Sequence, residues 1–249
     1  EPVKAVRRQD PHMHLLEACL FAHETWGDAE FGKMADEIVG LFQNYFFDGA
    51  RTALPEDYTD ELLPHPDKGH IFEPGHYCEW VWLLKKHAVM KNDAALHDPL
   101  CLKLLDWANR YGWDEIYGGI YDGVGENGRV IEDTKRIWPF CEALKANALM
   151  LNAAPDRQSI KDHVARMVDV FEDKYMQERG FWVEWLNRDL TPAADYMPGT
   201  TPYHVYFGIM ETWDAIDGRG QSVSLVSSIE EKLYGLRRSL SNAVKTLRA

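Results

Sequence analysis

Three histidines occupy positions from which an imidazole could move a proton to and from a substrate. His14, His76 and His204 each follow a proline at a distance of two or three residues and lie near the predicted start of a helix. A neutral imidazole can accept a proton at physiological pH and its conjugate acid can donate one, which suits general acid–base catalysis. Because a helix N-terminus disfavours a nearby positive charge, this placement predicts lowered pKa values for the three histidines.

Two glutamates accompany these histidines at helical spacing. Glu17 and Glu79 come three residues after His14 and His76, so each shares a helix face with its histidine and could orient the ring or bind a substrate hydroxyl. The same pairing could hold a metal ion, as in di-metal helix bundles. Such bundles need further inward carboxylates, and zinc proteases carry an H-E-x-x-H pattern; the sequence shows neither. We therefore predict no metal ligands.

The motifs of other enzyme classes are missing. The sequence lacks the G-x-S-x-G of serine hydrolases and the G-x-x-x-x-G-K phosphate loop. Its Gly118-Gly119 pair belongs to a predicted hairpin rather than to a strand-to-helix turn, which argues against a dinucleotide site. We predict no cofactor.

The tryptophans indicate a ligand class. Aromatic ring faces pack against the C–H faces of sugars, while carboxylates and arginines bind sugar hydroxyls. The chain has nine tryptophans, and six of them fall near the histidine motifs or on the predicted inner helices: Trp80, Trp82, Trp138, Trp182, Trp185 and Trp213. The alternative is that these large side chains fill a helical core. Their grouping near the histidines favours a carbohydrate pocket.

Hydrophobic periodicity predicts an all-α chain. The spacing of apolar residues favours helices over residues 15–26, 29–45, 77–91, 97–111, 135–151, 158–177, 203–217 and 229–247. Three intervening segments carry hairpin signals: residues 118–131, where Asn127-Gly128 separates two apolar runs, residues 181–189 and, more weakly, residues 46–49.

The predicted helix pairs recur at a nearly constant spacing. His14, His76, Trp138 and His204 lie near the starts of four successive pairs, 62, 62 and 66 residues apart. Helix pairs repeated in this way cannot bury their apolar faces alone, so they stack.

The distribution of charge separates inner helices from outer ones. Residues 77–91 and 135–151 are apolar around much of the circumference, whereas residues 158–177 and 229–247 are more charged. This pattern predicts an α/α toroid of the barrel type with about four helix pairs, forming a single domain over residues 1–249. The inner helices of such a toroid start on one rim, where the three histidines would converge in one pit.

Composition narrows the partners. The chain has 249 residues, with 27 Lys and Arg against 40 Asp and Glu, so the net charge is −13 and the isoelectric point about 5.2. This acidity argues against a nucleic-acid or anionic-membrane binder, and no apolar run approaches the ~20 residues of a membrane span. The four cysteines lie in helical segments without a C-x-x-C pair, which indicates reduced, packed thiols in a cytoplasmic protein: Cys19, Cys78, Cys101 and Cys141.

These residues resemble the N-acylglucosamine 2-epimerase superfamily, which includes N-acylglucosamine 2-epimerases, cellobiose 2-epimerases and mannose isomerases. The resemblance covers nearly the whole chain and rests on four ordered motifs: Arg7-Arg8-Gln9-Asp10-Pro11-His12-Met13-His14-Leu15-Leu16-Glu17-Ala18, Glu73-Pro74-Gly75-His76-Tyr77-Cys78-Glu79-Trp80, Trp138-Pro139 with Glu142-Ala143-Leu144-Lys145, and Pro202-Tyr203-His204. It implies an (α/α)6 barrel.

The resemblance also implies roles. His76 and His204 would be the acid–base pair on either side of the C1–C2 bond of the sugar, and His14 the third pocket histidine, linked to ring opening. The implied substrate-binding residues are Glu17, Glu79, Trp138 and Glu142. The implied chemistry is proton abstraction next to the sugar carbonyl through an enediol, with no redox cofactor.

The chain departs from the family at several positions. Asp10 stands where members often have Asn, and Phe140-Cys141 where many have Gln-Thr. Lys68 and His70 are candidates for the basic residue that usually precedes the second motif. These departures leave the identity of the sugar open.

Family chains carry additional helices ahead of the first histidine motif, so two of six helix pairs seem missing from this sequence. We expect either a natural protein that is longer at its N-terminus, which we favour, or self-association, for instance as a homodimer. In both cases the edges of the first and fourth pairs would expose apolar residues: Leu15, Leu16, Phe21 and Phe207.

The sequence thus predicts an isomerase that converts a mannose-like aldose to its ketose by histidine-mediated proton transfer. Epimerisation of an N-acylglucosamine or another glucose-type sugar at C2 is the alternative within the enzyme class. A non-catalytic carbohydrate-binding or self-associating helical fragment is the alternative outside it.

Overall fold

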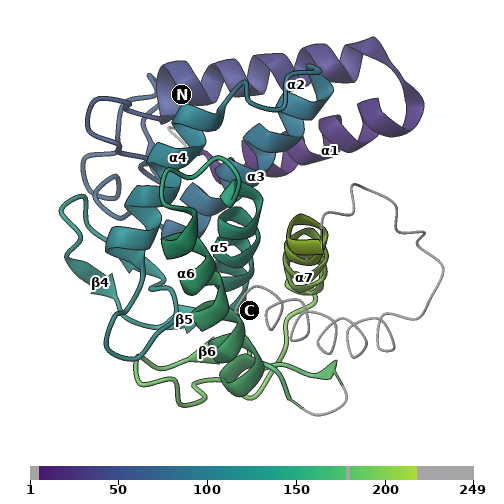
Figure 1. Ribbon diagram of the computed structural model, residues 1–249. Helices are drawn as coiled ribbons and strands as arrows, with labels where there is room; N and C mark the ends of the chain where they lie inside the picture. The colour runs from purple at the N-terminus through teal and green to yellow at the C-terminus, as the bar shows by residue number, and fades with distance from the viewer. Residues whose placement is uncertain (1–5, 178–179, 218–249) are drawn as a thin grey trace. The chain divides into compact units, whose positions relative to one another are not determined.

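The computed structural model describes residues 6–177 and 180–217, and its chain contacts divide into two compact units (Figure 1). Unit 1 comprises Glu1–Gly112 and Gly123–Glu132, and unit 2 comprises Trp113–Asp122 and Asp133–Ala249. The predicted helix over residues 229–247 and most of the polar loop before it lie outside the described residues.

Unit 1 holds two helix pairs and two short antiparallel ladders. Its elements are β1 (Arg7–Arg8), α1 (Asp10–Trp26), α2 (Ala29–Leu41), η1 (Phe42–Phe46), β2 (Asp57–Tyr58), α3 (Pro74–Met90), α4 (Asp98–Trp107), η2 (Ala108–Gly112), β3 (Gly123–Val124) and β4 (Val130–Glu132). Strand β1 pairs with β2, and β3 with β4.

Unit 2 holds a third helix pair and one further helix. Its elements are β5 (Lys135–Arg136), α5 (Ile137–Met150), α6 (Arg157–Val170), η3 (Phe171–Tyr175), β6 (Trp185–Leu186) and α7 (Pro202–Asp217). Strand β5 pairs with β6, and α7 packs against α5. The backbones of these two helices approach closely because position 208 is a glycine: a Cβ there would lie 2.7 Å from the Cys141 Cβ.

The inner and outer roles predicted from charge are confirmed within each unit. Nearly every residue of α3 and α5 is buried, whereas α2 and α6 each bury one face. None of the helices among the described residues has the length and apolar character needed to cross a membrane.

The repeat inferred from the sequence is visible in the helix starts. Helices α1, α3, α5 and α7 begin at residues 10, 74, 137 and 202, so successive starts are 64, 63 and 65 residues apart. Each of the outer helices α2, α4 and α6 ends in a five-residue π-helical turn, η1, η2 or η3.

A short strand pairing closes each repeat. The residues before α1 pair with β2, Phe72 before α3 pairs with Val124, and the residues before α5 pair with β6. In every case the partner strand lies in the loop that follows the helix pair. These pairings hold the start of each inner helix against that loop.

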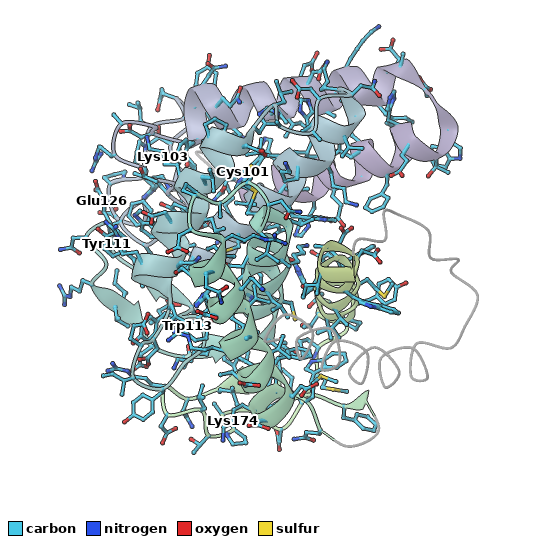
Figure 2. All side chains as sticks on the ribbon, viewed as in Figure 1. Cys101, Lys103, Tyr111, Trp113, Glu126 and Lys174 are labelled. Carbon is cyan, nitrogen blue, oxygen red and sulfur yellow. The ribbon has the colours of Figure 1, made fainter. Side chains whose placement is uncertain are left out.

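The predicted hairpin at Asn127-Gly128 is confirmed. Strands β3 and β4 flank this turn, and Gly128 has a positive φ of 77°. A side chain at this position would collide with the ring of Tyr111, 2.2 Å from an added Cβ, and Figure 2 labels Tyr111 beside Glu126 of the same turn. Glycine is therefore required here for both conformation and space.

The other two hairpin predictions hold in shorter form. Asp48 pairs with Ala53 after η1, and Leu186 pairs with Pro192 around the turn at Asn187. The pairing of β6 with β5 was not predicted.

The predicted exposure of the first helix pair is right for Leu15, which is 45% exposed, and wrong for Leu16, which is fully buried. Leu16 lies on the face of α1 that also buries Met13 and Leu20. Phe21 and Phe207 are half-buried. Trp26 at the end of α1 is 72% exposed and lines an apolar groove of about 390 Å³ between α1 and α2.

Candidate functional site

His76 lies in the first turn of α3 and is held by a glutamate from a loop. Its Nδ1 is 2.8 Å from Oε2 of Glu56, which immediately precedes β2. The other oxygen of Glu56 accepts hydrogen bonds from Nε2 of Gln9 at 3.0 Å and from the backbone N–H of Glu73 at 3.3 Å. Gln9 in turn accepts a hydrogen bond from Nε1 of Trp80 at 2.7 Å. A chain of hydrogen bonds thus connects α1, the loop before β2 and α3.

The charge around His76 reverses the pKa shift predicted from the sequence. Burial lowers the pKa of His76, but the carboxylates of Glu56, Glu73 and Glu79 together raise it to about 10. The prediction of a lowered pKa is therefore wrong for His76, because nearby full charges outweigh the partial charge of the helix N-terminus. At neutral pH this ring is an imidazolium.

His14 lies beside Glu17 and Glu79. Its Nδ1 is 3.9 Å from Oε2 of Glu17, and ligand atoms of the three residues lie within 4.8 Å of one another. The Glu17 carboxylate raises the pKa of His14, against the lowering effect of burial, and Glu79 and Asp10 add to the increase. The predicted lowering is thus wrong for His14 as well. Glu79, which is 2% exposed, influences both histidines of this unit.

Two groups in unit 1 have a composition that could hold a cation: His14 with Glu17 and Glu79, and His76 with Glu56 and Glu73. In the second group the His76 ring carries both of its protons at neutral pH and offers no lone pair to a metal. In the first, the histidine is half exposed. We assign neither group as metal ligands, and metal independence stays a prediction.

His204 in unit 2 lies in the first turn of α7 and also binds a carboxylate through Nδ1. The partner is Oε1 of Glu142 on α5, at 2.7 Å. The other oxygen of Glu142 is 2.7 Å from Nζ of Lys145, and both of these residues are almost completely buried. Burial alone would raise the pKa of Glu142, but Lys145 and His204 lower it. The ring of Trp138 lies 5.4 Å from the ring of His204.

An arginine that sequence reasoning missed lies next to Trp138. The Arg136 guanidinium is 5.2 Å from the Trp138 ring and 5.8 Å from the Trp185 ring. Asp122 fixes it, since its Oδ1 accepts from the Arg136 Nε at 3.0 Å and from the Arg136 backbone N–H at 2.9 Å. The arginine is therefore positioned beside two ring faces.

Sequence reasoning also missed an acid that recurs at one place in the repeat. Glu56, Asp122 and Glu184 are 66 and 62 residues apart, and each precedes the loop residue that pairs before an inner helix by two positions. Glu184 is buried, which raises its pKa, and accepts from Oγ1 of Thr201 at the start of α7 at 2.8 Å. Each acid thus binds the start of the following inner helix. The available signal was an acid 20, 16 and 20 residues before His76, Trp138 and His204.

The structure therefore assembles the seven predicted site residues in two groups. Unit 1 brings together His14, Glu17, His76 and Glu79, and unit 2 brings together Trp138, Glu142 and His204. The convergence of all three histidines in one pit stays a prediction.

The tryptophans divide between the two interpretations. Trp80, Trp82 and Trp182 are buried, as the core alternative holds. Trp138, Trp185 and Trp213 are half-buried.

Comparison with known proteins places this chain among sugar isomerases and epimerases. Residues 1–208 match the N-acylglucosamine 2-epimerase (GlcNAc 2-epimerase) family. The chain is 29% identical over 227 residues to a mannose-6-phosphate isomerase of Rhizobium meliloti (strain 1021), an alignment that covers 87% of this chain and 57% of the relative. The chain thus spans little more than half the length of this curated relative.

Solved structures show the same fold. A crystal structure of a D-mannose isomerase matches 85% of this chain and 57% of its own with a TM-score of 0.74 and 21% identity. A cellobiose 2-epimerase from Spirochaeta thermophila DSM 6192 matches 98% of this chain and 60% of its own with a TM-score of 0.72 and 11% identity. These likenesses confirm the predicted fold class, an all-α fold of the α/α-toroid type. The chain belongs to the N-acylglucosamine 2-epimerase family.

Proposed function

We propose that the protein is an aldose–ketose isomerase of a mannose-like sugar and that His76 and His204 transfer the proton. The observation that supports this is the matched setting of the two rings. Each lies in the first turn of an inner helix and gives Nδ1 to a buried or half-buried carboxylate. A proton exchanged with the substrate must therefore pass through Nε2 of either ring.

The charges next to the two rings support different roles. His76, an imidazolium at neutral pH, protonates the carbonyl oxygen and so offsets the negative charge that develops when a C–H bond breaks. The carboxylate partner of His204 is already offset by Lys145, so we assign proton removal to His204. Removal of the C2 proton leaves an enediol, and return of that proton to C1 yields the ketose.

The remaining predicted residues bind the sugar in this proposal. His14, Glu17 and Glu79 form a polar group next to His76 that suits hydroxyls and the opening of the sugar ring. Trp138 offers a ring face beside His204.

Epimerisation at C2 is the second candidate. Two separate histidines could serve opposite faces of the same carbon, so that the proton removed from one face returns to the other. The likeness to a cellobiose 2-epimerase favours this alternative at the level of the fold.

The cysteines and the apolar groove support two further proposals. All four cysteines are free and buried, as predicted, which fits a reducing compartment such as the cytoplasm. Self-association through an exposed apolar edge remains a proposal that light scattering on the 249-residue chain tests.

The function is tested by incubating the protein with mannose, glucose, N-acetylglucosamine and N-acetylmannosamine in D₂O. NMR then reports ketose, C2 epimer and deuterium at C1 or C2. We expect deuterated ketose from mannose, and about a 10²–10⁴-fold loss of turnover in His76→Asn and His204→Asn. His23→Asn, a histidine on α1 outside both groups, is the control. Near wild-type rates in both histidine variants would rule out the assignment, and no reaction with any sugar would favour a binding module.

A further inference from the structure

We propose that Glu56 is the positioning residue of His76: its carboxylate fixes the orientation of the ring through Nδ1 and compensates the positive charge of the ring. The inference rests on the proposed function, because positioning matters for the proton transfer assigned to His76. It adds a residue that lies outside the four sequence motifs and 20 positions ahead of the histidine.

The hydrogen bonds of Glu56 leave its carboxylate little freedom to rotate. Oε2 is bound to His76 at 2.8 Å, while Oε1 accepts from the Gln9 side chain at 3.0 Å and the Glu73 backbone at 3.3 Å. Gln9 is itself fixed by Trp80, and both are completely buried. Rotation of the carboxylate would break three hydrogen bonds together, so the His76 ring inherits the rigidity of the network.

The electrostatic setting points in the same direction. The charged groups facing His76 are Glu73 and Glu79 on its own helix and Glu56 from the loop before β2. Among the described residues, no lysine or arginine forms an ion pair with Glu56. The negative charge is thus compensated by the ring alone, and the pKa of His76 rises to about 10 despite burial.

The repeat allows a structural role to be separated from positioning. Asp122 occupies the place of Glu56 in the next repeat and holds the start of α5, but its partners are Arg136, Thr134 and Trp185 rather than a histidine. A variant of Asp122 therefore reports what the acid does for a helix start. A variant of Glu56 adds whatever the acid does for the imidazole.

The first experiment measures the titration of the His76 ring by ¹⁵N NMR in the sugar-free protein, assigned by its loss in His76→Asn. In the wild type we expect a doubly protonated ring at pH 8. A neutral ring at pH 8 would overturn the proposal without any variant. Because no sugar is present, this result is independent of whether the proposed reaction occurs.

The second experiment compares Glu56→Gln with Asp122→Asn. Glutamine keeps the size and a hydrogen-bond acceptor but removes the charge, so the His76 titration should move down by more than about one pH unit. In Asp122→Asn it should stay at the wild-type value, while both variants lower the melting temperature. A folded Glu56→Gln protein with a wild-type titration would show that Glu56 is structural only.

Kinetics add the readout on catalysis. Glu56→Gln should lower kcat by up to about 10²-fold with a smaller change in KM, since a misplaced ring affects the transition state more than sugar binding. Glu56→Asp, which retains the charge, should recover part of this loss. An unchanged kcat in an active enzyme would contradict positioning, whereas a wild-type enzyme without activity would contradict the proposed function only.

Discussion

His76 in unit 1 and His204 in unit 2 occupy the same place in the repeat but differ in how their charge is compensated. Glu56 reaches His76 from a loop and forms no other ion pair among the described residues. Glu142 reaches His204 from a neighbouring helix and shares its charge with Lys145. The comparison teaches that the helix start provides a position for a histidine, while the source and neutralisation of its carboxylate decide whether the ring carries a positive charge.

Replacing Lys145 by methionine should make unit 2 resemble unit 1. The variant leaves Glu142 buried with His204 as its remaining charged partner, so we expect a loss of about 3–5 kcal/mol in the free energy of unfolding. Urea unfolding followed by circular dichroism measures it. The control is Lys33→Met, which removes an exposed pair of the same i,i+3 spacing with Glu30 and should cost less than about 1 kcal/mol. Equal costs in the two variants would contradict the burial argument.

The pH dependence of turnover tests the charge on His76. If the imidazolium donates a proton, kcat/KM should persist to about pH 10 and fall about tenfold per pH unit above it. The sign follows from the raised pKa, because the protonated form is lost as the pH rises through it. An alkaline decline that begins near pH 7 would show that His76 is not held as an imidazolium.

A second buried histidine gives unit 2 the opposite pH sensitivity. Burial and the nearby Arg166 lower the pKa of His163 to about 4. Its contribution to stability is present above its unfolded pKa of about 6.5 and is lost as the pH falls toward 4, with an upper limit of about 3 kcal/mol. His163→Gln should reduce the acid-induced loss of stability measured by urea unfolding at pH 7 and pH 4.5. An undiminished loss would place the acid sensitivity elsewhere.

Chelation should have the smallest effect. Nδ1 of both rings is occupied by a carboxylate, so we expect turnover to change less than about twofold after exhaustive treatment with EDTA. Calcium-saturated EDTA is the matched control. Activity that disappears on chelation and returns with one particular divalent ion would replace the carboxylate-held histidines by a metal centre.

Much of the fold could be predicted because helix pairs leave a strong periodic signal. The first helix was nevertheless placed at residue 15, whereas α1 begins at Asp10. Pro11 interrupts the apolar pattern there, yet proline is well tolerated in a first helical turn because its missing N–H has no partner at that point. The ladders were missed because strands of two residues, such as β5 and β6, have no measurable period.

The site could be predicted only in part. His76 and Glu79 lie on one helix, so their spacing shows that they are neighbours. The partnership of Glu56 with His76 depends on a loop folding back by way of the β1–β2 pairing, which no local pattern encodes. The expected lowering of the pKa failed for the same reason, since it considered the helix without the acid that the loop delivers.

Gly208 gives this architecture an adjustable spacer. Position 208 determines how near α7 can come to α5, and Glu142 and His204 sit on those two helices. A single methyl group there would act as a shim that widens the gap and stretches the 2.7 Å contact between the carboxylate and the ring. Turnover could then be tuned, in laboratory evolution or in nature, by a residue one helical turn beyond the histidine.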